Sequence, residues 1–325
     1  MPRILITGAS GFVGKALLAD PQLDGWEVFA TCRSGESFAL SHPEVTSIAM
    51  DLMDARSIHQ VIEEVRPDRI IHLAAQSFVP ASFEDPAGTF QANVIGSIHL
   101  LEAIQVLRKS DPTYDPTTLL VASAEVYGKV SPDQLPITEA TPFNPQNPYA
   151  ASKASLIHVG RQYHASYGMR VILPVPFNHI GPGQSDRFVV SSFARQLAEI
   201  KLGLRSPEIR VGNLDAARDF TDVRDVVRAY GLLAESGAPG EVYNICSGMA
   251  VPIKDILNQL IELSGLDVQV VPDPARMRPS DAPVLVGESS RLVTTLNWKR
   301  KFLLVETLED ILNDWVYRLT SATPV

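Results

Sequence analysis

The stretch RILITGASGFVG, residues 3–14, decides the fold class. Its first part, Arg3–Thr7, is a short apolar run that is typical of a buried strand. Three glycines follow at three-residue spacing and lead into a helical pattern: Gly8, Gly11 and Gly14. Glycines so placed allow a tight turn, a close approach of the backbone to a pyrophosphate, and close packing of a helix on a sheet. The stretch therefore predicts a dinucleotide-binding loop, with Phe12 and Val13 among its cofactor contacts.

Beyond this loop, the first half of the chain alternates short apolar runs with helical patterns. The predicted strands span residues 27–31, 45–50, 69–74, 118–123 and 170–175. The predicted helices span residues 14–19, 55–65, 89–107 and 149–167. Strands that alternate with helices form a parallel sheet that is covered on both faces. The first half therefore predicts an α/β fold with a doubly wound parallel sheet of the Rossmann type, and a cofactor at the carboxyl ends of its strands.

The second half is less regular, because proline and glycine cluster at several places along it. Helical patterns occur at residues 189–201, 222–233, 253–263 and 305–319, and an apolar strand at residues 242–245. The second of these helices and the strand are expected to return to the sheet, and the other segments to form a smaller mixed C-terminal domain that binds substrate. The chain is thus expected to form two interleaved domains. These are a dinucleotide-binding domain of residues 1–175 plus about 215–247, and a substrate-binding domain of about 176–214 plus 248–325.

The composition argues against several functional classes. The 325 residues include 37 acidic and 28 basic side chains, for a net charge of −9. General nucleic-acid or membrane-surface binders are basic, so neither partner is expected. The two cysteines do not make a disulfide framework, and no signal segment or bilayer-spanning apolar stretch is visible. We therefore expect a protein of the reducing cytoplasm, without a metal site.

The residues that follow the second strand bear on the identity of the cofactor. Proteins that bind NAD usually carry an acidic residue there, and this chain has Arg33 instead. The guanidinium is expected to pair with a 2′-phosphate, which favours NADPH, whereas a solvated Arg33 would leave NADH possible. Two segments after the third and fourth strands are expected to meet the adenine and the ribose side. They are Asp51 with Leu52, and Leu73, Ala74, Ala75 and Gln76.

A tyrosine and a lysine four residues apart predict the chemistry. Pro148 suits the first position of a helix, and residues i and i+4 share a helix face, so Tyr149 and Lys153 are expected to lie together. A nearby ammonium favours the phenolate and would lower the pKa of Tyr149. Ser123, at the end of the fifth predicted strand, is placed to hydrogen-bond the same substrate oxygen. These side chains can protonate an oxygen whose carbon gains a hydride, or reverse that step.

The glycine loop, Ser123 and the Tyr149–Lys153 pair resemble the extended short-chain dehydrogenase/reductase family over nearly the whole chain. The resemblance implies activity on a nucleotide sugar, and it implies that Lys153 also holds the nicotinamide ribose. Four further segments are similar to those of reductases in this family that act on 4-keto-6-deoxy GDP-sugars. They are residues 176–184 (PFNHIGPGQ), 211–220 (VGNLDAARDF), 242–248 (VYNICSG) and 273–281 (DPARMRPSD).

The resemblance also implies a set of substrate-binding residues, namely Ser82, Asn178, His179, Arg218, Arg278 and Asp281. The two arginines can each offer a fork of donors to a diphosphate, and the asparagine can add a neutral donor. Asp281 can accept from ribose hydroxyls, and His179 is either a substrate contact or a structural residue. Val175 stands where such reductases usually carry an arginine.

Reduction of a C4 ketone is the favoured function, and three alternatives stay open. Glu125 lies two residues before Tyr127, where sugar-nucleotide 4,6-dehydratases place the carboxylate that removes the C5 proton. Glu125 is therefore either a catalytic base or a residue that positions the sugar. A 4-epimerase is a further alternative. A redox sensor without catalytic activity would bind NADPH on the same scaffold and never oxidise it.

The two long predicted helices at residues 89–107 and 149–167 carry apolar residues on more than one side. Such helices suit a four-helix contact between two subunits. Members of the family that the chain resembles commonly pair in this way. We therefore expect a homodimer.

Overall fold

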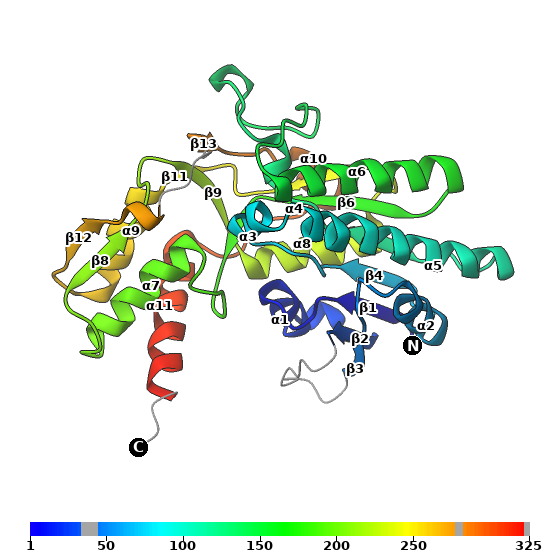
Figure 1. Ribbon diagram of the computed structural model, residues 1–325, viewed down its shortest axis with the longest axis horizontal. Coiled ribbons are helices and arrows are strands. Elements are labelled where there is room, and N and C mark those ends of the chain that lie inside the picture. The colour runs from blue at the N-terminus through cyan, green and yellow to red at the C-terminus, as the bar shows by residue number, and fades with distance from the viewer. Residues whose placement is uncertain (34–44, 277–281, 322–325) are drawn as a thin grey trace.

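The computed structural model describes residues 1–33, 45–276 and 282–321. Within these residues the main sheet has seven strands in the order β3-β2-β1-β4-β5-β6-β10, and every neighbouring pair is parallel (Figure 1). The strands are β1 (Arg3–Thr7), β2 (Glu27–Cys32), β3 (Thr46–Ala49), β4 (Arg69–His72), β5 (Thr117–Leu120), β6 (Val171–Pro176) and β10 (Val242–Ile245). The order reverses between β1 and β4, which confirms the predicted doubly wound α/β fold.

Helices cover both faces of this sheet (Figure 1). One face carries α2 (Ala55–Val65), α5 (Gly96–Ser110) and α6 (Pro148–Tyr167), and the other carries α1 (Phe12–Leu18), α8 (Val223–Ser236) and α10 (Ser290–Leu296). Successive strand residues point to opposite faces, so Leu5 packs in the layer of α2 and α5, whereas Ile4 and Ile6 pack with α1 and α8. All three side chains are buried, which explains why the sequence of β1 is a continuous apolar run.

Several predicted elements begin or end at different residues from those expected, as two regions illustrate. The region of the helix predicted at residues 89–107 contains α4 (Pro86–Phe90), one π-helical turn (Gln91–Ile95) and α5, and a short α3 (Val79–Glu84) precedes them. The strand predicted at residues 118–123 ends at Leu120, and the carbonyl of the next residue, Val121, accepts a hydrogen bond from Lys153. Short 3₁₀ turns occupy Pro21–Leu23, Ala124–Tyr127, Pro132–Gln134 and Pro274–Arg276.

A separate hydrophobic core lies beyond the main sheet, to the left in Figure 1. It joins α7 (Val189–Lys201), α9 (Ile253–Ser264) and α11 (Leu304–Ser321) with β8 (Glu208–Val211), and β8 pairs with β12 (Gln269–Pro272). Between this core and the sheet, β9 (Ala217–Asp222) pairs with β7 (Asn178–Ile180), β11 (Ala250–Pro252) and β13 (Val284–Leu285). The strands of this region, each two to six residues long, were not predicted.

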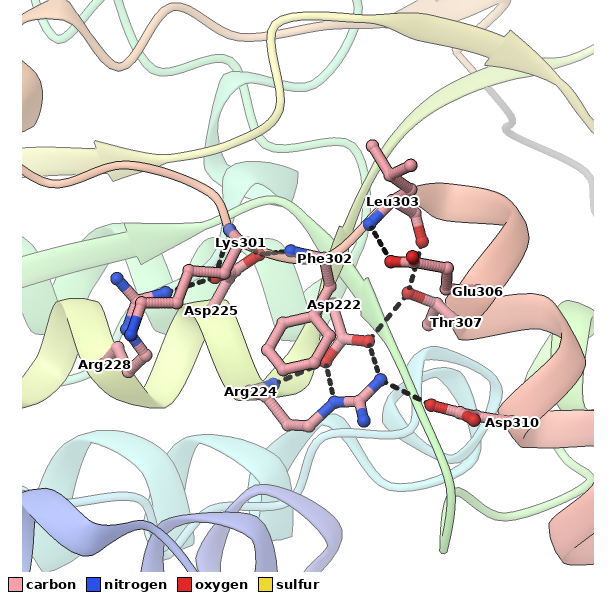
Figure 2. Close-up of polar contacts among 10 residues, drawn as sticks. All are labelled: Asp222, Arg224, Asp225, Arg228, Lys301, Phe302, Leu303, Glu306, Thr307 and Asp310. Atoms are coloured by element: carbon pink, nitrogen blue, oxygen red, sulfur yellow. Dashed lines mark hydrogen bonds and ion pairs between the residues drawn. The ribbon is translucent and has the colours of Figure 1, made fainter.

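Two acidic side chains at the start of α8 connect the sheet to the last part of the chain (Figure 2). Asp225 is fully buried, and its carboxylate accepts hydrogen bonds from the backbone N–H groups of Lys301 and Phe302 at 2.9–3.1 Å. Arg228, one turn later on α8, donates to the same carboxylate at 2.6 Å. The Asp225 carboxylate therefore ties the segment that leads into α11 to α8.

Asp222 makes a second connection from the N-cap of α8 (Figure 2). Its carboxylate accepts from the Thr307 hydroxyl of α11 at 2.7 Å and from the Arg224 guanidinium at 2.7 Å. Arg224 also donates to Asp310 of α11 at 2.7 Å, and its guanidinium lies 3.8 Å from the ring centroid of Phe302. These contacts hold α8 and α11 in one arrangement.

We predict that Asp225→Asn lowers the free energy of unfolding by about 3 kcal/mol, because the change weakens a buried ion pair and leaves an amide N–H facing backbone donors. The matched control is Asp310→Asn, whose carboxylate is 43% exposed and whose loss is expected to cost less than about 1 kcal/mol. Denaturant unfolding of both variants measures the difference. Equal losses would contradict the role given to Asp225.

Candidate active site

A cavity of about 1240 Å³ lies at the carboxyl ends of the sheet strands. Its walls include the segments directly after β1, β2, β4, β5 and β6, on both sides of the point where the strand order reverses. Doubly wound sheets bind nucleotides at this switch point. A pocket for one drug-sized ligand has roughly 300–1,000 Å³, so this cavity has room for a cofactor and a substrate together.

The glycine loop after β1 forms one wall of the cavity. Gly8 has φ +68°, and a Cβ there would lie 2.7 Å from the backbone nitrogen of Ala74. A Cβ on Gly14 would lie 2.6 Å from the Cα of Ala9. No larger residue fits at either position unless the backbone shifts, so the main chain itself lines the cavity here. The predicted contacts Gly8, Gly11, Phe12, Val13 and Gly14 all face this cavity, and the loop fits a dinucleotide.

The residues predicted to meet the adenosine half of the cofactor line the same cavity: Arg33, Asp51, Leu52, Leu73, Ala74, Ala75 and Gln76. The Asp51 carboxylate accepts from the backbone N–H of Met53 at 2.9 Å, which orders the turn after β3. The backbone of Gln76 is fixed by the Asn93 side chain, which accepts from its N–H at 2.8 Å and donates to its carbonyl at 3.0 Å. The structure therefore gathers the predicted cofactor residues around one space, and their contacts with a cofactor stay predictions.

The helix α6 begins at the cavity, and its sequence explains why. Asn147 is the N-cap, and its side-chain oxygen accepts from the backbone N–H of Ala150 at 2.7 Å. Pro148 follows in the first turn, where a missing N–H has no cost. Tyr149 and Lys153 therefore lie in the first two turns of α6, on the part of the helix that reaches the cavity.

Tyr149, Lys153 and Ser123 all line the cavity, as predicted from their spacing. Tyr149 is 8% exposed and Lys153 is 5% exposed. The Lys153 ammonium donates a hydrogen bond to the carbonyl of Val121 at 2.7 Å, which ties α6 to the end of β5. Ser123 follows that carbonyl by two residues, so one contact sets the relative positions of the serine and the helix.

The pKa values of the pair differ from the expectation drawn from the sequence. Burial raises the pKa of Tyr149 to about 12, and a hydrogen bond with Ser123 acts in the opposite direction. Burial lowers the pKa of Lys153 to about 8. The expected lowering of the Tyr149 pKa is therefore wrong for this structure, because loss of water around the phenol raises the pKa and the Glu125 charge acts in the same direction. At neutral pH Tyr149 is a protonated phenol, which is the form that donates a proton.

Glu125 also lines the cavity, and its carboxylate contacts the residue that begins α6. The Asn147 side-chain N–H donates to Glu125 at 3.3 Å, while the oxygen of the same amide caps the helix. One amide thus fixes both the catalytic helix and the carboxylate. A residue that positions the sugar must itself be fixed, and this contact fixes the Glu125 carboxylate. The contact is equally compatible with Glu125 as a catalytic base.

A chain of buried polar side chains lies behind the site. The two ring nitrogens of His72 lie 2.8 Å from the Thr7 hydroxyl and 3.0 Å from the Ser97 hydroxyl. Ser97 donates to the carbonyl of Asn93 at 2.8 Å, and the Asn93 amide donates to the Ser152 hydroxyl at 3.0 Å. None of these side chains is more than 2% exposed. The chain joins β1, β4, the π-helical turn and α6, so it holds the strands of the switch point against the catalytic helix.

Asn178 and His179 are the predicted substrate residues that the structure places at the cavity. The imidazole of His179 stacks on the ring of Phe12, with 6.2 Å between the ring centroids, and its Nδ1 lies 3.0 Å from the carbonyl of Phe177. Burial lowers the pKa of His179, so the ring is neutral at pH 7. The contact with the Phe177 carbonyl thus fixes the His179 ring, and the residue lines the cavity.

Two other predicted substrate residues, Ser82 and Arg218, lie outside the described cavity wall. Ser82 is fully buried and donates to the carbonyl of Val79 at 2.7 Å. Arg218 is 8% exposed and donates to the carbonyls of Ala217 and Ala282, each at 2.8 Å. Neither is among the described residues that line the cavity. Arg278 and Asp281 lie outside the described residues. Substrate binding by these four residues stays a prediction.

The cavity has aromatic wall residues that sequence reasoning missed. Phe78 and Phe188 meet edge to face, with 6.2 Å between their centroids, and Tyr230 comes from α8. Phe78 follows the predicted ribose segment by two residues, so the segment itself was a usable signal for it. No local pattern in α8 marks Tyr230, because there it has the spacing of an ordinary core residue.

Residues 1–33, 45–276 and 282–321 contain no group of three side chains suited to hold a metal ion. Over the same ranges, no helix has the length and apolar character needed to cross a bilayer.

A tyrosine that donates a proton at the carboxyl ends of a doubly wound sheet is the arrangement of the extended short-chain dehydrogenases/reductases, the class that the sequence resembles. Within that class, the chain belongs to the GDP-mannose 4,6 dehydratase family, whose model matches residues 5–311.

Comparison with individual relatives refines this assignment. The chain is 38% identical over 321 residues to the GDP-6-deoxy-D-mannose reductase of Pseudomonas aeruginosa, covering 98% of each protein. It is 31% identical to GDP-mannose 4,6 dehydratase 1 of Arabidopsis thaliana, covering 91% of this chain and 85% of that protein. The solved structure of RMD from Pseudomonas aeruginosa complexed with NADPH is similar with a TM-score of 0.84 at 36% identity, covering 98% of this chain and 100% of that one.

We predict a pH-dependent loss of stability that comes from His72. Burial, with the nearby Lys153 charge, lowers the pKa of His72 to about 3, whereas an unfolded histidine titrates near about 6.5. The stability that neutral His72 contributes is therefore complete above about pH 6.5 and is lost as the pH falls toward 3, by up to about 1.4 kcal/mol per pH unit. Unfolding free energies measured at pH 7.5 and pH 5 should fall more steeply for the wild type than for His72→Gln. His59→Gln, whose side chain is 38% exposed, is the control for the substitution itself. Parallel slopes for the wild type and His72→Gln would contradict this account.

Proposed function

We propose that the protein reduces the C4 keto group of GDP-4-dehydro-6-deoxy-D-mannose with NADPH and forms GDP-6-deoxy-D-mannose, also called GDP-D-rhamnose. The observation that carries this proposal is the buried, protonated Tyr149, which shares the cavity with Ser123. Reduction of a ketone requires a proton donor at the oxygen, and a phenol with a raised pKa holds its proton at neutral pH. The similarity to the GDP-6-deoxy-D-mannose reductase of Pseudomonas aeruginosa supports the same choice of substrate.

In the proposed reaction the reduced nicotinamide, when bound, supplies the hydride. Tyr149 delivers a proton to the C4 oxygen as the carbonyl becomes an alcohol. Ser123 donates a hydrogen bond to the same oxygen and thereby stabilises the negative charge that develops on it. The Lys153 ammonium stabilises the phenolate that Tyr149 leaves behind, because opposite charges in a buried site attract strongly.

The cofactor proposal rests on the residues that surround the cavity. The glycine loop would hold the pyrophosphate, and Asp51 and Leu52 would meet the adenine. Arg33, at the end of β2, would pair with a 2′-phosphate, which supports NADPH over NADH. The NADPH in the similar structure of RMD supports the same choice.

We further infer two functional units, a homodimer and a cytoplasmic location. The dinucleotide would bind to residues 1–175 plus about 215–247, which include the main sheet, and the substrate to about 176–214 plus 248–325, which include the core of α7, α9 and α11. Exposed apolar side chains on α5 and α6, at Val106 and Tyr167, support the dimer contact. The presence of only two cysteines in 325 residues supports a reducing compartment.

Absorbance of the nicotinamide tests the proposed reaction. Protein is mixed with NADPH and GDP-4-dehydro-6-deoxy-D-mannose, and a parallel sample receives GDP-mannose alone. We expect stoichiometric oxidation of NADPH with the keto-sugar and none with GDP-mannose. Formation of a keto-sugar from GDP-mannose without net consumption of NADPH would instead establish a dehydratase, the second candidate, for which Glu125 in the cavity is the supporting observation.

A substitution at Glu125 separates the two candidate reactions. If the carboxylate only positions the sugar, Glu125→Gln should keep kcat for keto-sugar reduction within about tenfold, because the amide oxygen can still accept from Asn147. If Glu125 is the base of a dehydratase, Glu125→Gln should slow the dehydration of GDP-mannose by a factor of roughly 10²–10⁴. Tyr149→Phe is the control that must lose activity in either case. A loss from Glu125→Gln in keto-sugar reduction as large as that from Tyr149→Phe would contradict the positioning role.

A further inference from the structure

Tyr230 is a wall residue of the cavity to which the proposed reaction gives no role. It lies on α8, on the face of the sheet opposite α6, and it is only 1% exposed. Its hydroxyl has no hydrogen-bond partner among the residues that the structure describes. Some buried polar atoms among the described residues are sealed from solvent and have no partner, but the Tyr230 hydroxyl is not one of them. It is therefore open to the cavity that Tyr230 lines. A buried phenol of this kind usually has a partner, so the missing one is expected to be a ligand.

Three other buried tyrosines differ from Tyr230 in this respect. The Tyr127 hydroxyl donates to the Asn244 side chain at 2.8 Å. The Tyr243 hydroxyl accepts from the backbone N–H of Ala238 at 3.0 Å. Tyr114 does have an unpaired, buried hydroxyl, but it does not belong to the residues that line the cavity. Of these four tyrosines, Tyr230 alone combines a hydroxyl without a partner with a place in the cavity wall.

The position of Tyr230 identifies the part of the cavity that it serves. α8 packs against β4, β5 and β6, the strands whose ends carry the ribose segment, Ser123 and Asn178. Tyr149 lies close enough to help raise the pKa of Tyr230, after the larger effect of burial. Because Tyr149 must stand at the reacting carbonyl, Tyr230 is near the end of the cavity where hydride transfer takes place.

We propose that the Tyr230 hydroxyl is a hydrogen-bonding contact for the carboxamide of the nicotinamide ring, and that it positions the ring from the α8 side of the cavity; this inference rests on the proposed NADPH-dependent function. A phenol both donates and accepts, and a carboxamide offers a carbonyl oxygen and an NH₂ group, so the two groups match. A neutral contact suits this place, because burial keeps Tyr230 protonated.

The test compares three Tyr→Phe variants, each of which removes a single hydroxyl. NADPH binding is measured by calorimetry without sugar substrate, and stability by thermal unfolding of the ligand-free protein. Tyr230→Phe should weaken NADPH binding by about three- to tenfold, the range that the loss of one hydrogen bond produces, with an unchanged melting temperature. Tyr243→Phe should lower the melting temperature and keep the NADPH affinity. Tyr114→Phe should change neither.

A second ligand locates the contact. Adenosine 2′,5′-bisphosphate carries the 2′-phosphate but no nicotinamide, so it should bind to the wild type and to Tyr230→Phe equally well. NADPH affinity of Tyr230→Phe equal to that of the wild type would overturn the proposal, and so would an equal loss for both ligands. If the wild type binds NADPH but never oxidises it with the keto-sugar, the proposed reaction fails, and the binding comparison still decides the role of Tyr230.

Discussion

The site depends on the hydrogen bond between the Lys153 ammonium and the carbonyl of Val121. The ammonium is almost fully buried, so it requires a strong acceptor, and the carbonyl at the end of β5 provides one at 2.7 Å. The contact fixes the first turns of α6 against the segment that carries Ser123. The buried chain from Thr7 through His72 and Asn93 to Ser152 holds the same helix from behind. Two independent sets of hydrogen bonds thus position Tyr149, as a site that transfers a proton requires.

The fold class and the centre of the site could be predicted because they depend on local rules. The alternation of apolar runs and helical patterns indicates a parallel sheet, and the run from Arg3 to Gly14 marks the strand, turn and helix that face the cofactor cavity. Helical spacing alone brings Tyr149 and Lys153 to one face of α6. The strand that ends before Ser123 belongs to the same edge of the sheet, so topology brings the serine to the tyrosine.

The remainder depends on long-range packing that no local pattern contains. The pKa of Tyr149 follows from how much water the folded protein excludes, and that quantity cannot be read from a lysine four residues away. The prediction that Arg218 binds a phosphate stays open, but its hydrogen bond to the carbonyl of Ala282, sixty-four residues further along, could not be predicted from local sequence. Tyr230 has the spacing of a core residue, and only the packing of α8 against the sheet brings it to the cavity.

The hydrogen bonds between α8 and the segment from Lys301 to Thr307 have a consequence for folding during synthesis. α8 carries Tyr230 into the cavity wall, while its Asp222 and Asp225 accept some of their hydrogen bonds from groups between Lys301 and Thr307. During synthesis on a ribosome, the strands that surround the glycine loop emerge more than two hundred residues before those groups. A nascent chain can therefore assemble much of the nucleotide-binding sheet early, yet two buried carboxylates lack some of their hydrogen-bond donors until residues 301–307 have emerged.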